Sequence, residues 1–178
     1  MKVFVTGATV LVGAHLVLAL LSKGHQVRLL VRSREKAQIY FKSHGHTLDD
    51  IVIGNMNETD KIRRALSGCD AVFHAAANVN LDIRQIDSTV KSNLESMESV
   101  IGSAINAGIK NIVWVSSTTV FDHDKRGFID ENTPLRTSKT PIPNQNYSVK
   151  NGRAISNSSA PLFKSPIQLV LSALMTHH

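Results

Sequence analysis

The amino-acid sequence predicts an α/β fold, with a doubly wound parallel sheet covered by helices on both faces. Three observations support this prediction. Short strand-like runs alternate with helical patterns, the connections between them are short, and 42% of the 178 residues are hydrophobic. This length is sufficient for one domain with a substantial core and too short for two ordinary domains.

The strands and helices can be assigned in order along the first two thirds of the chain. Strands are expected over residues 3–5, 26–31, 51–53, 71–75 and 111–116, and the last of these is predicted to be the most buried. Helices are expected over 12–21, 34–43, 58–66 and 86–107. Gly24 follows the first helix and suits the left-handed conformation that ends it, and Gly68 and Gly108 close the third and fourth.

The pattern weakens after Phe121. Residues 122–146 indicate a long polar loop, 147–156 a helix, and 167–174 either a strand or a helix.

The net charge of +6 is distributed unevenly. Residues 1–131 contain 15 Lys and Arg against 14 Asp and Glu, whereas residues 132–178 contain five basic residues and no acid. The isolated basic pairs and an aromatic content of 5% argue against a nucleic-acid partner. The eight histidines lack supporting ligands at metal-binding spacing, so no metal site is expected.

The sequence also suggests a cellular compartment. No apolar run reaches the roughly 18 residues that suggest a membrane span, and the N-terminus does not resemble a signal peptide. The single cysteine, Cys69, has no internal partner for a disulfide, which is typical of a reducing compartment. We therefore expect a cytoplasmic protein with no membrane partner.

The segment from Val5 to Gly13 is the strongest local motif, because it joins a predicted strand to a predicted helix. Gly7 and Gly13 would let the backbone turn tightly and approach a pyrophosphate at the helix N-terminus. Val10 stands between them, where a β-branched side chain adds bulk and disfavours positive φ. A strand–helix turn that binds no ligand is the alternative interpretation of this segment.

Four further segments follow in order: Val31-Arg32-Ser33, residues 70–77, Asn93-Leu94, and residues 115–121. Together with the turn they resemble the extended short-chain dehydrogenase/reductases, Rossmann-fold proteins that include dihydroflavonol reductases and nucleotide-sugar epimerases. The resemblance covers residues 1 to about 150. It implies a dinucleotide-binding domain over 1–146 and a divergent or truncated segment over 147–178. The cofactor-binding residues it implies are Gly7, Thr9, Val10, Leu11, Gly13, Arg32, Asn55, Met56, Ala75, Ala76, Ala77 and Asn93.

The residue after the second strand bears on the choice of cofactor. An acid there would bind the ribose hydroxyls of NAD, whereas an arginine accommodates the 2′-phosphate of NADP. The chain has Arg32, with Arg34 and Lys36 close by, which favours NADP over NAD. The alternative is that Arg32 is only a solvated residue.

The resemblance also implies a reaction centre. Ser117, with Thr118 as the fallback, would orient a carbonyl, and Tyr147 would transfer a proton with its pKa lowered by Lys150. The family spacing is Tyr-x-x-x-Lys, and this chain is one residue shorter. On a helix, that difference displaces Lys150 by about 100° around the axis and about 1.5 Å along it.

The function expected is NADP-dependent oxidation or reduction of an alcohol or carbonyl on a small organic substrate. The alternatives are a nucleotide-sugar epimerase or dehydratase, a non-catalytic NADP-binding module, and an inactive fragment. A homodimer is expected through the helix over 86–107, although its apolar stripe is equally explained by packing on its own sheet.

Overall fold

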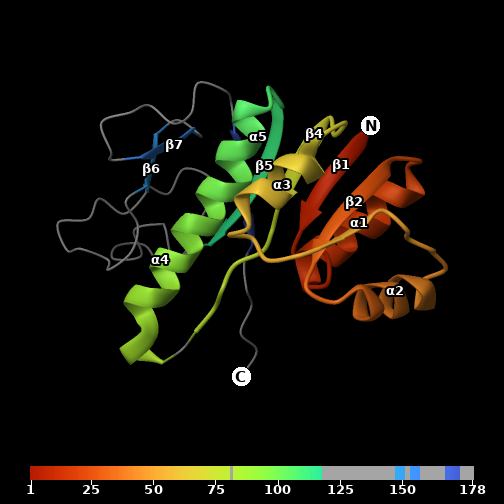
Figure 1. Ribbon diagram of the computed structural model, residues 1–178, viewed down its shortest axis with the longest axis horizontal. Helices are drawn as coiled ribbons and strands as arrows, with labels where there is room; N and C mark the ends of the chain where they lie inside the picture. Colours follow the sequence, from red (N-terminus) through yellow and green to blue (C-terminus); the bar gives the residue numbers. More distant parts are fainter. Residues whose placement is uncertain (81, 118–146, 151–152, 157–166, 173–178) are drawn as a thin grey trace, which may run out of the picture.

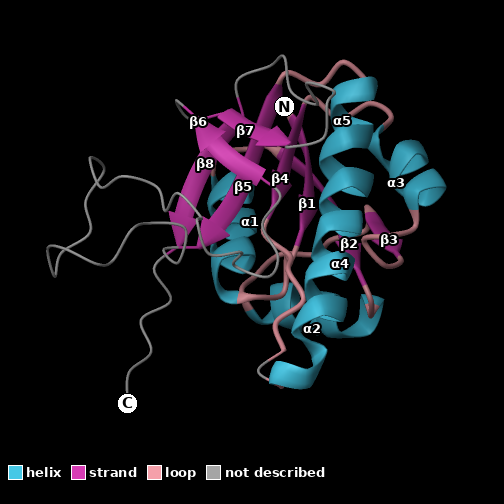
Figure 2. Ribbon diagram, turned by 90° about the vertical axis from the view of Figure 1, so that its left-hand side faces the viewer, coloured by secondary structure: helices cyan, strands magenta, loops and turns pink. Residues whose placement is uncertain are grey.

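The computed structural model describes residues 1–80, 82–117, 147–150, 153–156 and 167–172, and it places helices on both faces of a central sheet (Figures 1 and 2). The strands of the first part of the chain are β1 (Lys2–Thr6), β2 (Gln26–Val31), β3 (Ile51–Ile53), β4 (Ala71–His74) and β5 (Asn111–Ser117). The helices between them are α1 (Leu11–Ser22), α2 (Arg34–Ser43), α3 (Thr59–Leu66), α4 (Ile86–Met97) and α5 (Ser103–Asn106). A 3₁₀ turn (Ile83–Gln85) leads into α4.

The central sheet has six strands in the order β3-β2-β1-β4-β5-β8, and every neighbouring pair is parallel. The predicted doubly wound sheet is therefore confirmed. Its last strand, β8 (Ile167–Ser172), settles the choice between strand and helix for that segment in favour of the strand. The order of strand addition reverses between β1 and β4, and in such sheets the ligand crevice lies outside the carboxyl ends of the strands at that point.

Three sequence expectations are wrong in detail. The helix expected over 147–156 is instead an antiparallel pair, β6 (Tyr147–Lys150) and β7 (Arg153–Ser156). The dipeptide between them, Asn151-Gly152, is the sequence most typical of two-residue hairpins, and this signal outweighs the weak helical pattern. The most buried strand is β4, all of whose residues are buried, whereas β5 has intermediate burial along most of its described length.

The third difference concerns the long helix expected over 86–107. It is present, but a π-helical turn at Glu98–Gly102 separates α4 from α5. Such turns insert one extra residue into the helical ladder and cannot be recognised from apolar spacing alone. The turn lies where the helix packs on β4 and α3, with Val100 and Ile101 fully buried.

The core consists of two hydrophobic clusters on opposite faces of the sheet. Alternate residues of β1 point to different clusters, with Val5 facing α1 and α2 and Phe4 facing α3 and the α4–α5 helix. Phe41 of α2 and Ile62 of α3 are fully buried and anchor their helices to these two faces. Each such side chain contributes about 1.5–3 kcal/mol through burial, so both layers are required to hold the strands that carry the site.

An ion-pair network closes the amino edge of the sheet. Asp50 binds Lys2 Nζ and Arg28 Nε, each at 2.7 Å, and Asp70 accepts a hydrogen bond from the Lys2 backbone N–H at 2.6 Å. Burial alone would raise the pKa of Asp50, but hydrogen bonds from Arg28 and Lys2 outweigh it, and the pKa lies below its usual value. The network ties β1 and β2 to the segments that lead into β3 and β4.

Candidate functional site

The turn after β1 runs directly against the chain that leaves β4. Gly7 has a φ of +72°, and a Cβ at this position would lie 2.8 Å from both the carbonyl carbon of Ala75 and the amide nitrogen of Ala76. Glycine is therefore required at position 7 both by its left-handed conformation and by the close approach of the Ala75–Ala76 backbone.

Gly13 serves a different purpose in the first turn of α1. A Cβ at position 13 would overlap the carbonyl oxygen of Gly7 and lie 2.8 Å from the Gly7 carbonyl carbon. The helix can therefore approach the turn only because residue 13 has no side chain. This packing brings the amino end of α1 to the carboxyl edge of the sheet.

Val10 is the N-cap residue of α1, and its backbone does not need glycine. Its φ of −102° and ψ of 163° are extended, so the expected conflict with positive φ is wrong. Its N–H donates to Gly7 O at 3.1 Å and its carbonyl accepts from Ala14 N–H at 2.8 Å. The isopropyl group points outward, with the residue 51% exposed.

The first turn of α1 is left without a cap. Val10 supplies no side-chain acceptor, the turn contains no acidic residue, and the amides of Leu11, Val12 and Gly13 have no hydrogen-bond acceptor in the described part of the chain. Three free N–H groups at the positive end of a helix are suited to binding an anion. Of the predicted residues, Gly7, Thr9, Val10, Leu11 and Gly13 all lie within this turn.

The segment after β4 lies beside the Gly7 turn at the carboxyl edge of the sheet. Ala75 and Ala76 are half-buried and Ala77 is exposed. Asn93 of α4 fixes the next residue, since its Oδ1 accepts from Asn78 N–H at 2.7 Å and its Nδ2 donates to Asn78 O at 2.8 Å. Its amide group is thus occupied by the loop backbone, which sequence reasoning did not anticipate.

The basic side chains that follow β2 differ in whether they already form hydrogen bonds within the protein. Arg34 donates to the carbonyl oxygens of Ile51 at 2.6 Å and Asp49 at 3.4 Å, so it is part of the scaffold. Ser33 caps α2 by accepting from Lys36 N–H at 3.3 Å. Arg32 is exposed, and its side chain has no partner among the described residues.

The loop after β3 contains the predicted residues Asn55 and Met56. Glu58 holds this loop by accepting from Asn55 N–H at 3.0 Å and by pairing with Lys61, which in turn donates to Ile53 O at 3.0 Å. The hydrogen bond from Lys61 lowers the pKa of Glu58. The loop is therefore fixed at the same edge of the sheet as the other predicted residues.

The predicted catalytic residues lie on strands of two different sheets. Ser117 is the last residue of β5 and pairs in register with Ser172 of β8. Tyr147 and Lys150 are in β6, which belongs to a separate two-stranded sheet. The helical geometry assumed for that pair is absent, and Thr118 lies outside the described residues.

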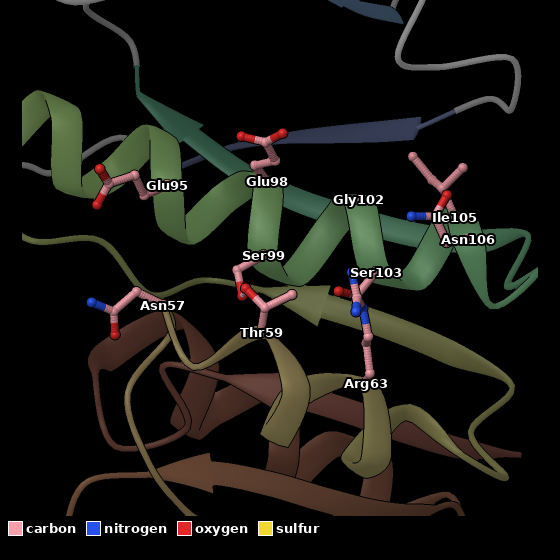
Figure 3. Close-up of a pocket in the computed structure, with 10 residues that line it drawn as sticks. All are labelled: Asn57, Thr59, Arg63, Glu95, Glu98, Ser99, Gly102, Ser103, Ile105 and Asn106. Atoms are coloured by element: carbon pink, nitrogen blue, oxygen red, sulfur yellow. Dashed lines mark hydrogen bonds between the residues drawn. The ribbon is translucent and has the colours of Figure 1, made fainter.

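A groove that the sequence did not predict lies between α3 and the α4–α5 helix. It has a volume of about 480 Å³, and none of the predicted site residues lines it. Figure 3 shows Ser99 facing Thr59, which accepts its hydrogen bond at 3.0 Å, and Arg63 pointing toward Ser103. The groove follows the π-helical turn, a feature that apolar spacing does not reveal.

The described residues contain neither a metal-binding cluster nor a helix that could span a membrane. In the described residues, no group of three or more His, Cys, Asp or Glu is arranged to hold a metal ion. None of the helices in this part of the chain is long and apolar enough to cross a membrane.

Comparison with known proteins agrees with this geometry. Residues 7–142 match the family model described as NAD(P)H-binding. The chain is 32% identical over 137 residues to a 4-hydroxy-2-methyl-3-oxo-4-farnesyl-3,4-dihydroquinoline-1-oxide ketoreductase of Stigmatella aurantiaca, covering 76% of this chain and 39% of that protein. It is 35% identical over 133 residues to the photosystem II assembly factor Ycf39 of Synechocystis, covering 73% and 38% of the two chains.

Solved structures show the same fold. The UDP-glucose 4-epimerase of Bifidobacterium longum, in complex with NAD⁺ and UDP, superposes with a TM-score of 0.69 at 23% identity over 80% of this chain and 45% of its own. The chain spans less than half the length of each of these three proteins. The chain belongs to the NAD(P)H-binding family, and its described residues have the Rossmann-type fold of these relatives.

Proposed function

We propose that this chain binds NADP and takes part in the oxidation or reduction of an alcohol or carbonyl on a small organic substrate. The observation that carries the proposal is the uncapped amino end of α1, where three free amides stand behind the Gly7 turn. Gly7 and Gly13 let the turn and the first turn of α1 pack closely against neighbouring backbone, which brings the free amides to the carboxyl edge of the sheet. The residues present therefore fit a dinucleotide.

The preference for NADP over NAD rests on Arg32. It follows β2, is exposed, and has neither an acidic residue beside it in sequence nor a side-chain partner in the described structure. A guanidinium can bind a 2′-phosphate through two parallel hydrogen bonds. Lys36 would add a second positive charge from the first turn of α2, whereas Arg34 is held by backbone carbonyls.

When bound, the cofactor would supply or accept the hydride. In this proposal Ser117 orients the substrate oxygen at the carboxyl end of β5, Tyr147 gives or takes the proton, and Lys150 assists. Residues 1–146 form the dinucleotide-binding unit, to which β8 adds an edge strand, and the rest of residues 147–178 form a divergent segment. We also propose that the protein is cytoplasmic. We propose that it forms a homodimer through the α4–α5 helix.

Two alternatives have observations in their favour. The likeness to the epimerase favours a reaction on a nucleotide sugar, in which the cofactor is reduced and reoxidised in one cycle. The placement of Tyr147 and Lys150 in β6, and the relative named as an assembly factor, favour an NADP-binding module without catalysis.

Titration with NADPH and NADH tests the proposal. We expect NADPH to bind more tightly, and the Arg32→Ala variant to weaken NADPH about 10- to 100-fold, the effect of losing a charge-assisted hydrogen bond, with little change for NADH. Arg64→Ala removes the same charge from an exposed position on α3 and serves as the matched control.

Each outcome of this titration distinguishes the alternatives. If neither nucleotide binds at millimolar concentration, both the enzyme and the module are refuted. Equal losses of NADPH and NADH affinity in Arg32→Ala would refute the 2′-phosphate role. Tight NADPH binding without turnover on a panel of carbonyl substrates would favour the module.

A further inference from the structure

A buried pair of polar side chains joins the carboxyl ends of β1 and β4. Thr6 Oγ1 and His74 Nδ1 form a hydrogen bond of 2.6 Å, and the two residues are 0% and 2% exposed. Thr6 and His74 are the last residues of their strands and lie opposite each other in the parallel register. The backbone continues the link, because Ala75 N–H donates to Thr6 O at 3.2 Å.

Core packing alone gives no reason for this choice of residues. Two polar groups taken out of water must compensate each other to offset their desolvation, and an apolar pair of similar size would avoid that requirement. Burial lowers the pKa of His74 to about 4, so the imidazole is neutral near pH 7 and the bond joins two neutral groups. A hydrogen bond depends on the direction between its two groups as well as on their distance, whereas an apolar contact does not depend on direction. The Thr6–His74 bond can therefore fix how β1 and β4 lie relative to each other.

The pair lies one residue before the point where the Gly7 turn meets the Ala75–Ala76 backbone. Gly7 follows Thr6 and Ala75 follows His74, and the space between them does not admit even a Cβ on Gly7. A small shift of β4 along or away from β1 would therefore either press these backbones together or move the Ala75–Ala77 segment away from the Gly7 turn. A short side-chain bond at this point fixes their spacing.

We propose that Thr6 and His74 are positioning residues, whose hydrogen bond holds the Gly7 turn and the Ala75–Ala77 segment at the spacing that nucleotide binding requires. The inference rests on the proposed binding of a dinucleotide at this edge of the sheet. Neither side chain touches the nucleotide; both act through the backbone that follows them.

The test replaces both polar groups at once. In the Thr6→Val/His74→Leu variant both groups of this hydrogen bond are removed, so neither is left buried without the other, and we expect a melting temperature close to that of the wild type. We expect NADPH affinity to fall about fivefold, equivalent to one net hydrogen bond of about 1 kcal/mol. Thr6→Ser keeps the hydroxyl, and its affinity should stay within about twofold of the wild type.

Amide hydrogen exchange gives a readout that does not depend on the nucleotide. We expect amides of residues 7–10 and 75–77 to exchange faster in the double variant than in the wild type or Thr6→Ser, at equal melting temperature. Unchanged exchange and unchanged affinity in a folded double variant would overturn the positioning role. If the wild type binds neither nucleotide but the double variant still exchanges faster, the proposed function would be refuted. The role of the Thr6–His74 hydrogen bond in holding β1 and β4 together would remain supported.

Discussion

Replacing Val10 with aspartate tests what the amino end of α1 does. The extended backbone of residue 10 already has the conformation of a cap residue, and its side chain points to solvent. An aspartate carboxylate could accept hydrogen bonds from the free N–H groups of Val12 and Gly13. The same carboxylate would stand where we place the phosphates, so stability and nucleotide affinity should change in opposite directions.

The size of both effects follows from the geometry. A new cap contributes about 1 kcal/mol, and a negative charge at a helix N-terminus adds about 0.5 kcal/mol. For a domain of this length, that corresponds to a rise in melting temperature of about 3–6 °C. Two like charges about 4 Å apart near a protein surface repel by about 4 kcal/mol, so NADPH binding should weaken at least about 100-fold.

Differential scanning fluorimetry and nicotinamide fluorescence titration measure the two quantities on the same samples. Val10→Ser caps the helix without a charge and should give about 1 kcal/mol of stability with a smaller loss of affinity. Ile39→Asp adds the same charge at an exposed position in α2 and should change neither quantity appreciably. A stabilised Val10→Asp protein that binds NADPH as the wild type does would refute the phosphate site at α1.

Three further predictions concern stability. Gly13→Ala should lower the free energy of unfolding by about 3 kcal/mol or more in urea denaturation, because its Cβ would overlap Gly7 O; a loss below 1 kcal/mol would contradict this packing. Asp50→Asn should cost about 1 kcal/mol, since the carboxylate is 37% exposed and screened, and 1 M NaCl should remove most of the difference; an effect insensitive to salt would argue against the ion pairs. The pKa of His74 is lowered from 6.5 to about 4 by burial, so the unfolded chain binds the proton first, and stability should fall by about 3 kcal/mol between pH 6.5 and pH 4. Replacing His74 with leucine, together with Thr6→Val, should abolish that slope, and its persistence would place the titration elsewhere.

The regular part of the fold could be predicted because its signals are local. The five strands and the helices between them follow from runs of apolar residues and from glycines that end helices, and the structure has them within about one residue of the expected bounds. The pairing of β6 with β7 is not evident from periodicity, because residues 147–156 carry a weak helical pattern, and its main local signal is the Asn151-Gly152 dipeptide. The π-helical turn depends on contacts with α3 and β4, which no local pattern encodes.

The candidate site was predictable to the extent that its residues act through the backbone. The segment from Gly7 to Gly13 could be recognised because only glycine meets its steric demands. The hydrogen-bond partners of individual side chains could not be predicted, because they come from distant segments. Arg34 donates to a carbonyl oxygen of β3, and Asn93 accepts from the loop after β4. The conformation of Val10 was also unpredictable, since φ there is set by the start of α1 and not by the residue type.

The ion-pair network at the amino edge of the sheet has a consequence for the rate of ligand encounter. Lys2 and Arg28 both pair with Asp50, so its carboxylate offsets part of their positive charge at that edge. Arg32 and Lys36, at the opposite edge, have no compensating carboxylate partner in the described residues, and their field extends outward over about one Debye length. Arg32 and Lys36 would therefore draw an anionic ligand to the carboxyl edge, with an association rate that falls as ionic strength rises.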